Sequence, residues 1–242
     1  MKKNIKFLIF LAAIVLVVTV TSACGKSFPN DLTVNGEKIT QKEYETALAQ
    51  VEYDTEMYIQ STFDKEMSDD FWSNTYDGKE GYAILTDKAL DRIKYVHAVY
   101  DLAYEAEDID DRSFEAIAKR CEKENRRRKE AVQNGEVIYG LKEYSFDLYE
   151  QYEMSMLKET YCNSYDRDGM TLSQQEVEEH YHSQDWFIGE DAQKASFDDA
   201  KIAVERDLRE QKYDEIVENK AASYEIKGND DRLVAFTETV IK

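Results

Sequence analysis

Residues 32–44, Leu-Thr-Val-Asn-Gly-Glu-Lys-Ile-Thr-Gln-Lys-Glu-Tyr, constrain the fold more than any other stretch of this chain. Asn35-Gly36 supplies the two residues of positive φ that a two-residue type I′ hairpin requires, and apolar residues flank the pair. Thr40 and Glu43 have the spacing of a capping box, in which each side chain accepts a hydrogen bond from the other residue's backbone N–H. The segment therefore predicts a short β-hairpin that leads directly into an amphipathic helix.

The rest of the chain has a helical pattern. Apolar residues recur at steps of three and four, and Ser or Thr caps precede several of these segments. The expected helices cover Gln41–Thr62, Glu80–Ala106, a segment capped by Ser113 that stops at Asn134-Gly135, Ser145–Tyr165, a segment from Ser173 through His182, and one from Ser196 through Ile216. Two strand-like segments, Tyr224–Lys227 and Leu233–Ile241, close the chain. The predicted fold class is mainly α with a small antiparallel β-sheet, an α+β arrangement.

The N-terminus has the order of an export signal: lysines first, then a mostly apolar run over residues 7–20, then Thr21-Ser22-Ala23-Cys24. The apolar run is shorter than the roughly 20 residues that a membrane-spanning helix needs. Ser22 to Gly25 resembles a lipobox, which predicts lipidation of Cys24; an uncleaved or ordinarily cleaved signal is the alternative. We thus expect a signal peptide over 1–23, a tether over 24–31 and one folded domain over 32–242, anchored by lipid, such as palmitate, at the outer face of the cell membrane.

The charge of the chain argues against nucleic acid as a partner. Without residues 1–23 the chain has 28 Lys and Arg against 51 Asp and Glu, a net charge of −23 over 219 residues. Such a surface repels nucleic acid and anionic lipid headgroups. We therefore interpret the basic run over residues 126–129 as a solvated helix face.

Cysteine and histidine patterns do not indicate a catalytic or metal site. Cys121 and Cys162 either form one disulfide that closes a loop of about 40 residues, a stabilisation of about 2–4 kcal/mol, or remain two buried, unpaired thiols. Glu176 and His180 share a helical face, a partial divalent-metal pattern that we interpret as a solvated helix end. Asp166-Arg-Asp-Gly169 lacks the acids that a calcium loop needs at its first and twelfth positions, so a turn between helices is favoured. We expect no metal, no cofactor and no enzymatic activity.

Three segments in this order resemble the SurA and PrsA family of extracytoplasmic foldases: Val34–Tyr44, Met170–Tyr181 and Ser196–Ala222. In that family these segments form a helical chaperone domain, and a parvulin-type prolyl isomerase domain lies between the second and the third. Here residues 184–195 alone fill that interval, whereas an independently folded domain needs on the order of 50 residues. The resemblance implies a chaperone domain without the isomerase, closed by both chain ends, so that the first hairpin and Tyr224–Lys227 share one sheet.

The resemblance also implies a function: a membrane-anchored chaperone that binds unfolded exported proteins without prolyl isomerase chemistry. The alternative is a structural or assembly lipoprotein that uses the same scaffold to bind one envelope partner. Client contact would use aromatic and Met side chains, which accept many sequences, although packing in the core or against loops is the competing interpretation for each. The candidates are Tyr58, Phe63, Phe71, Trp72, Tyr76, Met154, Met156, Trp186 and Phe187.

Overall fold

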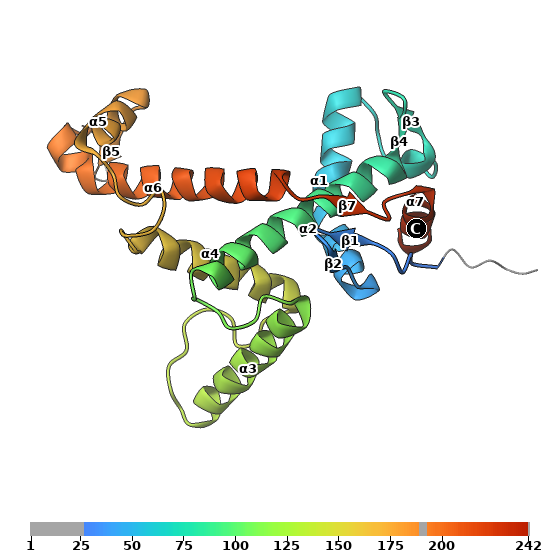
Figure 1. Cartoon of the computed structure of the whole chain (residues 1–242), viewed down its shortest axis with the longest axis horizontal. Coiled ribbons are helices and arrows are strands. Elements are labelled where there is room, and N and C mark those ends of the chain that lie inside the picture. Colours follow the sequence, from blue (N-terminus) through green and yellow to red (C-terminus); the bar gives the residue numbers. More distant parts are fainter. Residues whose placement is uncertain (1–26, 189–192, 242) are drawn as a thin grey trace, which may run out of the picture.

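The computed structural model describes residues 27–188 and 193–241, so the predicted signal peptide and Cys24 lie outside the described residues. Figure 1 shows a body around the crossing of α1 and α2, a long helix α6 that carries α5 away from that body, and an arm built from α3 and α4, of which α4 packs against α2 and α6. The helices are α1 (Gln41–Phe63), α2 (Gly81–Glu105), α3 (Phe114–Gln133), α4 (Phe146–Asn163), α5 (Gln174–Ser183), α6 (Phe197–Ala222) and α7 (Asp231–Val240). The first six agree with the predicted helices, and the predicted fold class is confirmed. Within the described ranges, no helix has the length and apolar character needed to cross a membrane.

The sheet that joins the two chain ends is short but specific. Strand β1 (Thr33–Val34) lies between β2 (Glu37–Lys38) and β7 (Ile226–Lys227) and pairs antiparallel with both. In the turn between β1 and β2, Asn35 and Gly36 have φ values of 49° and 82°, as the Asn-Gly pair predicts. The expected sheet between the N-terminal hairpin and the C-terminal segment is therefore confirmed.

Two further hairpins complete the strands of the described residues. They are β3 (Thr75–Tyr76) with β4 (Lys79–Glu80), and β5 (Phe187–Ile188) with β6 (Gln193–Lys194). A short 3₁₀ turn, η1 (Phe71–Ser73), precedes β3. These elements lie almost entirely between the helices expected from the sequence.

The prediction of a strand over Leu233–Ile241 is wrong, because this segment forms α7. Asp230 caps the helix by accepting from the backbone N–H of Arg232. Its buried face holds Phe236 and Thr237, and the Thr237 hydroxyl lies 2.6 Å from the Tyr44 hydroxyl of α1. Val and Thr favour strands locally, but burial of one face against the rest of the protein decides in favour of the helix.

The predicted tether also differs in part from the structure. Phe28 is buried, and its ring lies 5.6 Å from that of Tyr44 and 5.2 Å from that of Phe236. Asp31 forms an ion pair of 2.7 Å with Arg232 in α7. Residues 28–31 thus belong to the folded body, because Phe28 fills a space between the two chain ends.

Helix α6 passes through two hydrophobic cores. Its C-terminal half contributes Tyr213 and Val217 to the main core, which also includes the buried faces of α1, α2 and α7. Its N-terminal half contributes Ala200 and Val204 to a smaller core with α5. The smaller unit, which we call the head, consists of α5, β5, β6 and the first half of α6 (Figure 1).

Candidate client-binding surface

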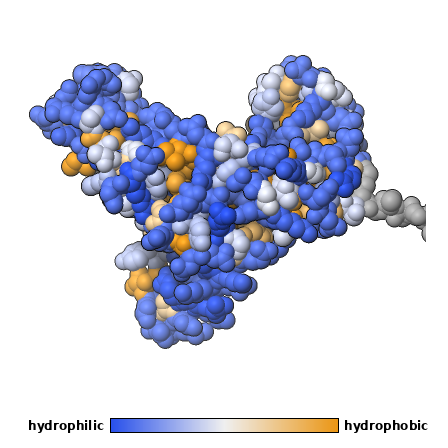
Figure 2. Space-filling model, viewed as in Figure 1, coloured by the Kyte–Doolittle hydropathy of each residue, from blue (hydrophilic) through white to orange (hydrophobic). Residues whose placement is uncertain are grey.

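The arm exposes a set of large apolar side chains. In α4, three of them follow one another at steps of four residues, which places them on one face of the helix. The loop between α3 and α4 adds three more exposed side chains. We call this set the arm surface, and it consists of Val137, Tyr139, Leu141, Leu148, Tyr152 and Met156. Figure 2 shows hydrophobic surface on the lower part of the molecule, where Figure 1 places the arm.

Two side chains of α3 hold the loop that carries Tyr139 and Leu141. The buried Arg128 guanidinium donates to the carbonyl of Tyr139 at 3.0 Å and to that of Leu141 at 2.6 Å, and it lies 4.6 Å from the centre of the Tyr144 ring. The Asn125 side chain exchanges two hydrogen bonds with the Tyr144 backbone, at 2.9 and 2.8 Å. The backbone between the exposed side chains is therefore anchored.

The interpretation of residues 126–129 as one solvated helix face is wrong at Arg128. Arg126 and Arg127 are exposed, but Arg128 is buried. The sequence does contain an indication that Arg128 is buried, since Cys121 and Arg128 are seven residues apart and therefore share one side of α3. The run of four basic residues made a solvated face the more obvious interpretation.

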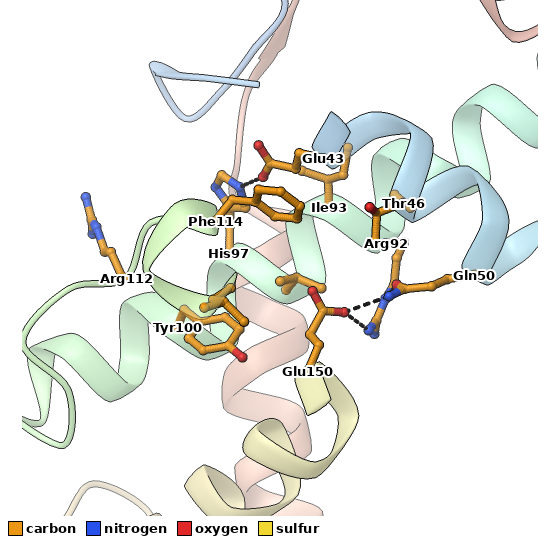
Figure 3. A pocket seen from close by; sticks show the side chains of 13 residues that line it. Glu43, Thr46, Gln50, Arg92, Ile93, His97, Tyr100, Arg112, Phe114 and Glu150 are labelled. Atoms are coloured by element: carbon orange, nitrogen blue, oxygen red, sulfur yellow. Dashed lines mark hydrogen bonds and ion pairs between the residues drawn. The ribbon is translucent and has the colours of Figure 1, made fainter. Parts of the chain in front are cut away.

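A buried ion pair attaches the arm to the body (Figure 3). Arg92 of α2 donates to Glu150 of α4 at 2.7 Å, while the Gln50 amide of α1 donates to the same carboxylate at 2.9 Å and accepts from Arg92 at 2.7 Å. The cavity beside these groups has a volume of about 20 Å³, which holds about one water molecule. This arrangement is a structural joint between three helices and too small for a ligand.

A second joint lies one turn further along α4. The Glu153 carboxylate accepts from Arg120 of α3 at 2.7 and 3.0 Å, and from the hydroxyls of Tyr100 and Tyr149 at 2.8 Å each. Burial, together with the charge of Glu153, raises the pKa of both tyrosines. Their hydroxyls therefore stay protonated and donate to Glu153, which fixes the tilt of α4 against α2 and α3.

His97 lies at the other end of the small cavity (Figure 3). Its Nε2 is 2.7 Å from a carboxylate oxygen of Glu43, and its Nδ1 is 3.9 Å from Glu37. Burial lowers the pKa of His97, but the hydrogen bond and charge of Glu43, then Glu37 and Asp101, raise it above the ordinary value. Arg112 joins this cluster by ion pairs to Glu37 and Asp101. The cluster ties the first hairpin to α1 and α2.

The structure separates the nine predicted client contacts into three groups. Tyr58, Met156 and Phe187 are exposed, and among these Met156 belongs to the arm surface. Phe63, Met154 and Trp186 are partly buried and pack against the two cores. Phe71, Trp72 and Tyr76 are buried, which agrees with the competing interpretation of these three as packing residues.

The aromatic residues of the 64–79 segment are buried because that segment folds back. Phe71 and Trp72 stand edge to face with ring centres 5.1 Å apart, and the Tyr76 hydroxyl donates to the Phe71 carbonyl at 2.7 Å. Although acidic residues surround them in the sequence, the 3₁₀ turn and the β3–β4 hairpin place the rings against α2.

Cys121 and Cys162 are both free and buried, the second of the two alternatives that the sequence left open. The Cys162 thiol lies 3.7 Å from the Arg209 carbonyl. Burial raises the pKa of Cys162 to about 11 and raises that of Cys121 as well. Both thiols are therefore protonated and poorly reactive near neutral pH.

On α5, Glu176 and His180, the two residues of the partial metal pattern, form ion pairs with side chains of α6. His180 pairs with Asp207 of α6 at 2.7 Å, and Glu176 pairs with Lys212 at 2.7 Å while it also completes the capping box with Ser173. Within the described ranges, no group of three or more His, Cys, Asp or Glu side chains is arranged to hold a metal ion.

Taken together, the fold and the arm surface define a helical protein that presents apolar groups on a rigid support, which suits binding to another protein. No family model matches the chain. It is 29% identical over 188 residues to the "Chaperone for lacto-N-biosidase" of Bifidobacterium longum subsp. longum, a match that covers 78% of this chain and 67% of the relative. The GH136 lacto-N-biosidase of Eubacterium ramulus overlaps 61% of this chain and 30% of its own, with 17% identity and a TM-score of 0.46.

The curated relative is a chaperone, in agreement with the class of protein predicted from the sequence. Neither this relative nor any family model supports a foldase of the SurA and PrsA type, so that part of the resemblance is not supported. The name of this relative specifies one enzyme, lacto-N-biosidase.

Proposed function

We propose that this protein is an extracytoplasmic chaperone dedicated to one client, and that the client is an exported enzyme of the lacto-N-biosidase kind. The observation that carries the proposal is the similarity to the Bifidobacterium longum chaperone over 78% of the chain. This function combines the chaperone role with the alternative of one specific partner.

In this proposal the protein acts by binding and does no chemistry on its client. The polar clusters of the described part are closed by their own hydrogen bonds and ion pairs, such as Glu150 with Arg92 and Glu153 with Arg120. The exposed apolar groups of the arm are instead free to cover a client surface that would otherwise aggregate. Prolyl isomerase activity is accordingly not expected.

A lipid anchor on Cys24 belongs to the same proposal. It would hold the chaperone where exported chains emerge, on the outer face of the membrane. Replacing Cys24 by Ser should move the protein from the membrane fraction to the soluble fraction and abolish labelling with a radioactive fatty acid. Unchanged membrane association in this variant would contradict the anchor.

The test of the proposed function is co-expression with the lacto-N-biosidase of Bifidobacterium longum, both chains carrying export signals. We expect at least about tenfold more soluble, active enzyme with the chaperone than without it. An unrelated exported glycosidase in the same host is the control and should gain nothing. No gain for the lacto-N-biosidase would contradict the proposal.

A general chaperone for unfolded exported proteins is the second candidate, favoured by the exposed Met156 and Tyr152, because Met and Tyr adapt to many partners. It predicts equal gains for the lacto-N-biosidase and the control glycosidase. Capture from the native envelope also separates the two: one stoichiometric partner supports the dedicated chaperone, and a heterogeneous set supports the general one.

A further inference from the structure

We infer that the arm surface is the place where the client docks, and that it fits a protein face whose apolar centre is rimmed by acidic side chains. This inference rests on the proposed function and adds to it the location and the chemistry of the contact.

The first observation is the exposure of large apolar groups on an ordered support. Tyr139 is 86% exposed and Val137 is 77% exposed, although both lie in a loop whose backbone Arg128 and Asn125 hold. A loop that is already ordered loses little conformational entropy when a partner covers it. Large exposed rings on an anchored backbone are typical of binding surfaces.

The second observation is a groove beside the α4 stripe. Tyr152 and Met156 line a depression between α3 and α4, together with Ile109 from the end of the α2–α3 connection. The Tyr152 ring stacks on that of Tyr144, with centres 5.2 Å apart and an angle of 20° between planes. Because Tyr144 belongs to the loop and Tyr152 lines the groove, the stacked rings connect the loop to the groove.

The third observation is the local charge. Residues 114–145 contain eight basic and six acidic side chains, whereas the whole chain has a formal net charge of −20. A hollow of α3 next to the loop is lined by three exposed basic side chains, Arg126, Lys129 and Lys142, and by two exposed acids, Glu122 and Glu143. This margin has a small positive excess in an otherwise acidic chain, so it favours a partner with acidic groups around its apolar centre. The acidic remainder of the chain makes nucleic acid an unfavourable partner.

The apolar part of the inference is tested in the co-expression assay with the Bifidobacterium longum lacto-N-biosidase. The double variant V137S/Y139S should lose about tenfold or more of the enzyme activity that the wild-type chaperone yields. The matched control is Ile202→Ser, since Ile202 is 85% exposed on α6 in the head. This control should keep the wild-type yield within about twofold, and circular dichroism should show that both variants are folded.

The charged margin is tested by binding between the purified chaperone and the same lacto-N-biosidase. Arg126→Glu should weaken binding about fivefold and make it less sensitive to added salt. Arg206→Glu is the matched control, because Arg206 is exposed on a helix and pairs with Glu210 four residues away, as Arg126 pairs with Glu122. The control should bind like the wild type.

The outcomes separate this inference from the proposed function. If the wild type rescues the enzyme and V137S/Y139S rescues it equally well, the docking surface is elsewhere and the inference is wrong while the proposed function stands. If I202S loses as much as the loop variant, the contact is not specific to the arm, which also overturns the inference. If the loop variant only converts a dimer of the chaperone into a monomer, the surface belongs to a second copy of this chain. If the wild-type chaperone does not rescue the enzyme, both the proposed function and the inference are wrong.

Discussion

At the scale of single residues, burial changes the role of Arg128 from a surface charge to an anchor of a loop. Its guanidinium supplies donors to two loop carbonyls, and hydrogen bonds that involve a charged group contribute about 1.5–3 kcal/mol each. The type of residue does not reveal this role, since the neighbouring arginines are exposed.

Replacing Arg128 by Gln should therefore release the loop. We expect chymotrypsin to cleave after Tyr139 or Leu141 about tenfold faster than in the wild type, because the carbonyls of both residues lose their donor. Lys129→Gln, at the next and exposed position, serves as the control. Equal cleavage rates in the two variants would show that Arg128 does not hold the loop.

The two cysteines provide a second prediction. Because Cys121 and Cys162 are buried and their pKa values are raised, the native protein should react with a thiol reagent at pH 8 far more slowly than the denatured protein. Two thiols should be counted after denaturation without reductant in protein that lacks residues 1–24. A count of zero would indicate a disulfide and contradict the structure.

His97 predicts the direction of a pH effect. Its pKa is raised in the folded state, so its stabilising pair with Glu43 is fully present below the unfolded pKa of about 6.5 and is lost as pH rises through the higher folded-state value. The groups that face it are Glu43, Glu37, Asp101 and Arg112. The difference in unfolding free energy between wild type and His97→Gln should thus be largest near pH 6 and shrink towards about pH 9. A difference that grows with pH would contradict this assignment.

At the scale of elements, local sequence signals and tertiary burial agree in most places and disagree at the C-terminus. The capping box at Thr40 forms as predicted, and a second box forms at Ser173, because both partners of each box lie within four residues. The segment 231–240 shows the opposite case, since its buried face becomes favourable for a helix only after α1 and α2 are in place.

In the turn between β7 and α7, the backbone at Gly228 predicts a loss of stability on substitution. Gly228 has a φ of +80°, and a Cβ there would lie 2.7 Å from the Asp31 carbonyl oxygen, so Gly228→Ala should lower the unfolding free energy by about 2–3 kcal/mol. Gly135→Ala is the matched control, with a φ of +73° and open space around its Cβ. It should cost about 1 kcal/mol, the backbone penalty alone. Equal losses in urea unfolding would show that the contact with Asp31 has no effect.

At the scale of the whole molecule, α6 connects two cores, and this predicts unequal local stability. Val204 and Val217 are both fully buried on the same helix, the first in the head and the second in the main core. Val204→Ala should increase hydrogen exchange in α5 and the first half of α6 while leaving α1 and α2 unchanged. Val217→Ala should instead increase exchange in α1 and α2, with a loss of about 2 kcal/mol. Identical exchange patterns would indicate one cooperative unit.

The sequence alone determined the class of fold, six of the helices and the first hairpin, because caps, turns and apolar periodicity act over a few residues and are visible in the local pattern. The tertiary structure decided which apolar and charged residues reach the surface. Phe71 and Trp72 are buried where η1 packs against α2, Arg128 turns inward to a loop eleven residues away, and Tyr139 remains exposed. Burial depends on neighbours that are distant in the chain, so the candidate site emerged only when the helices were placed together.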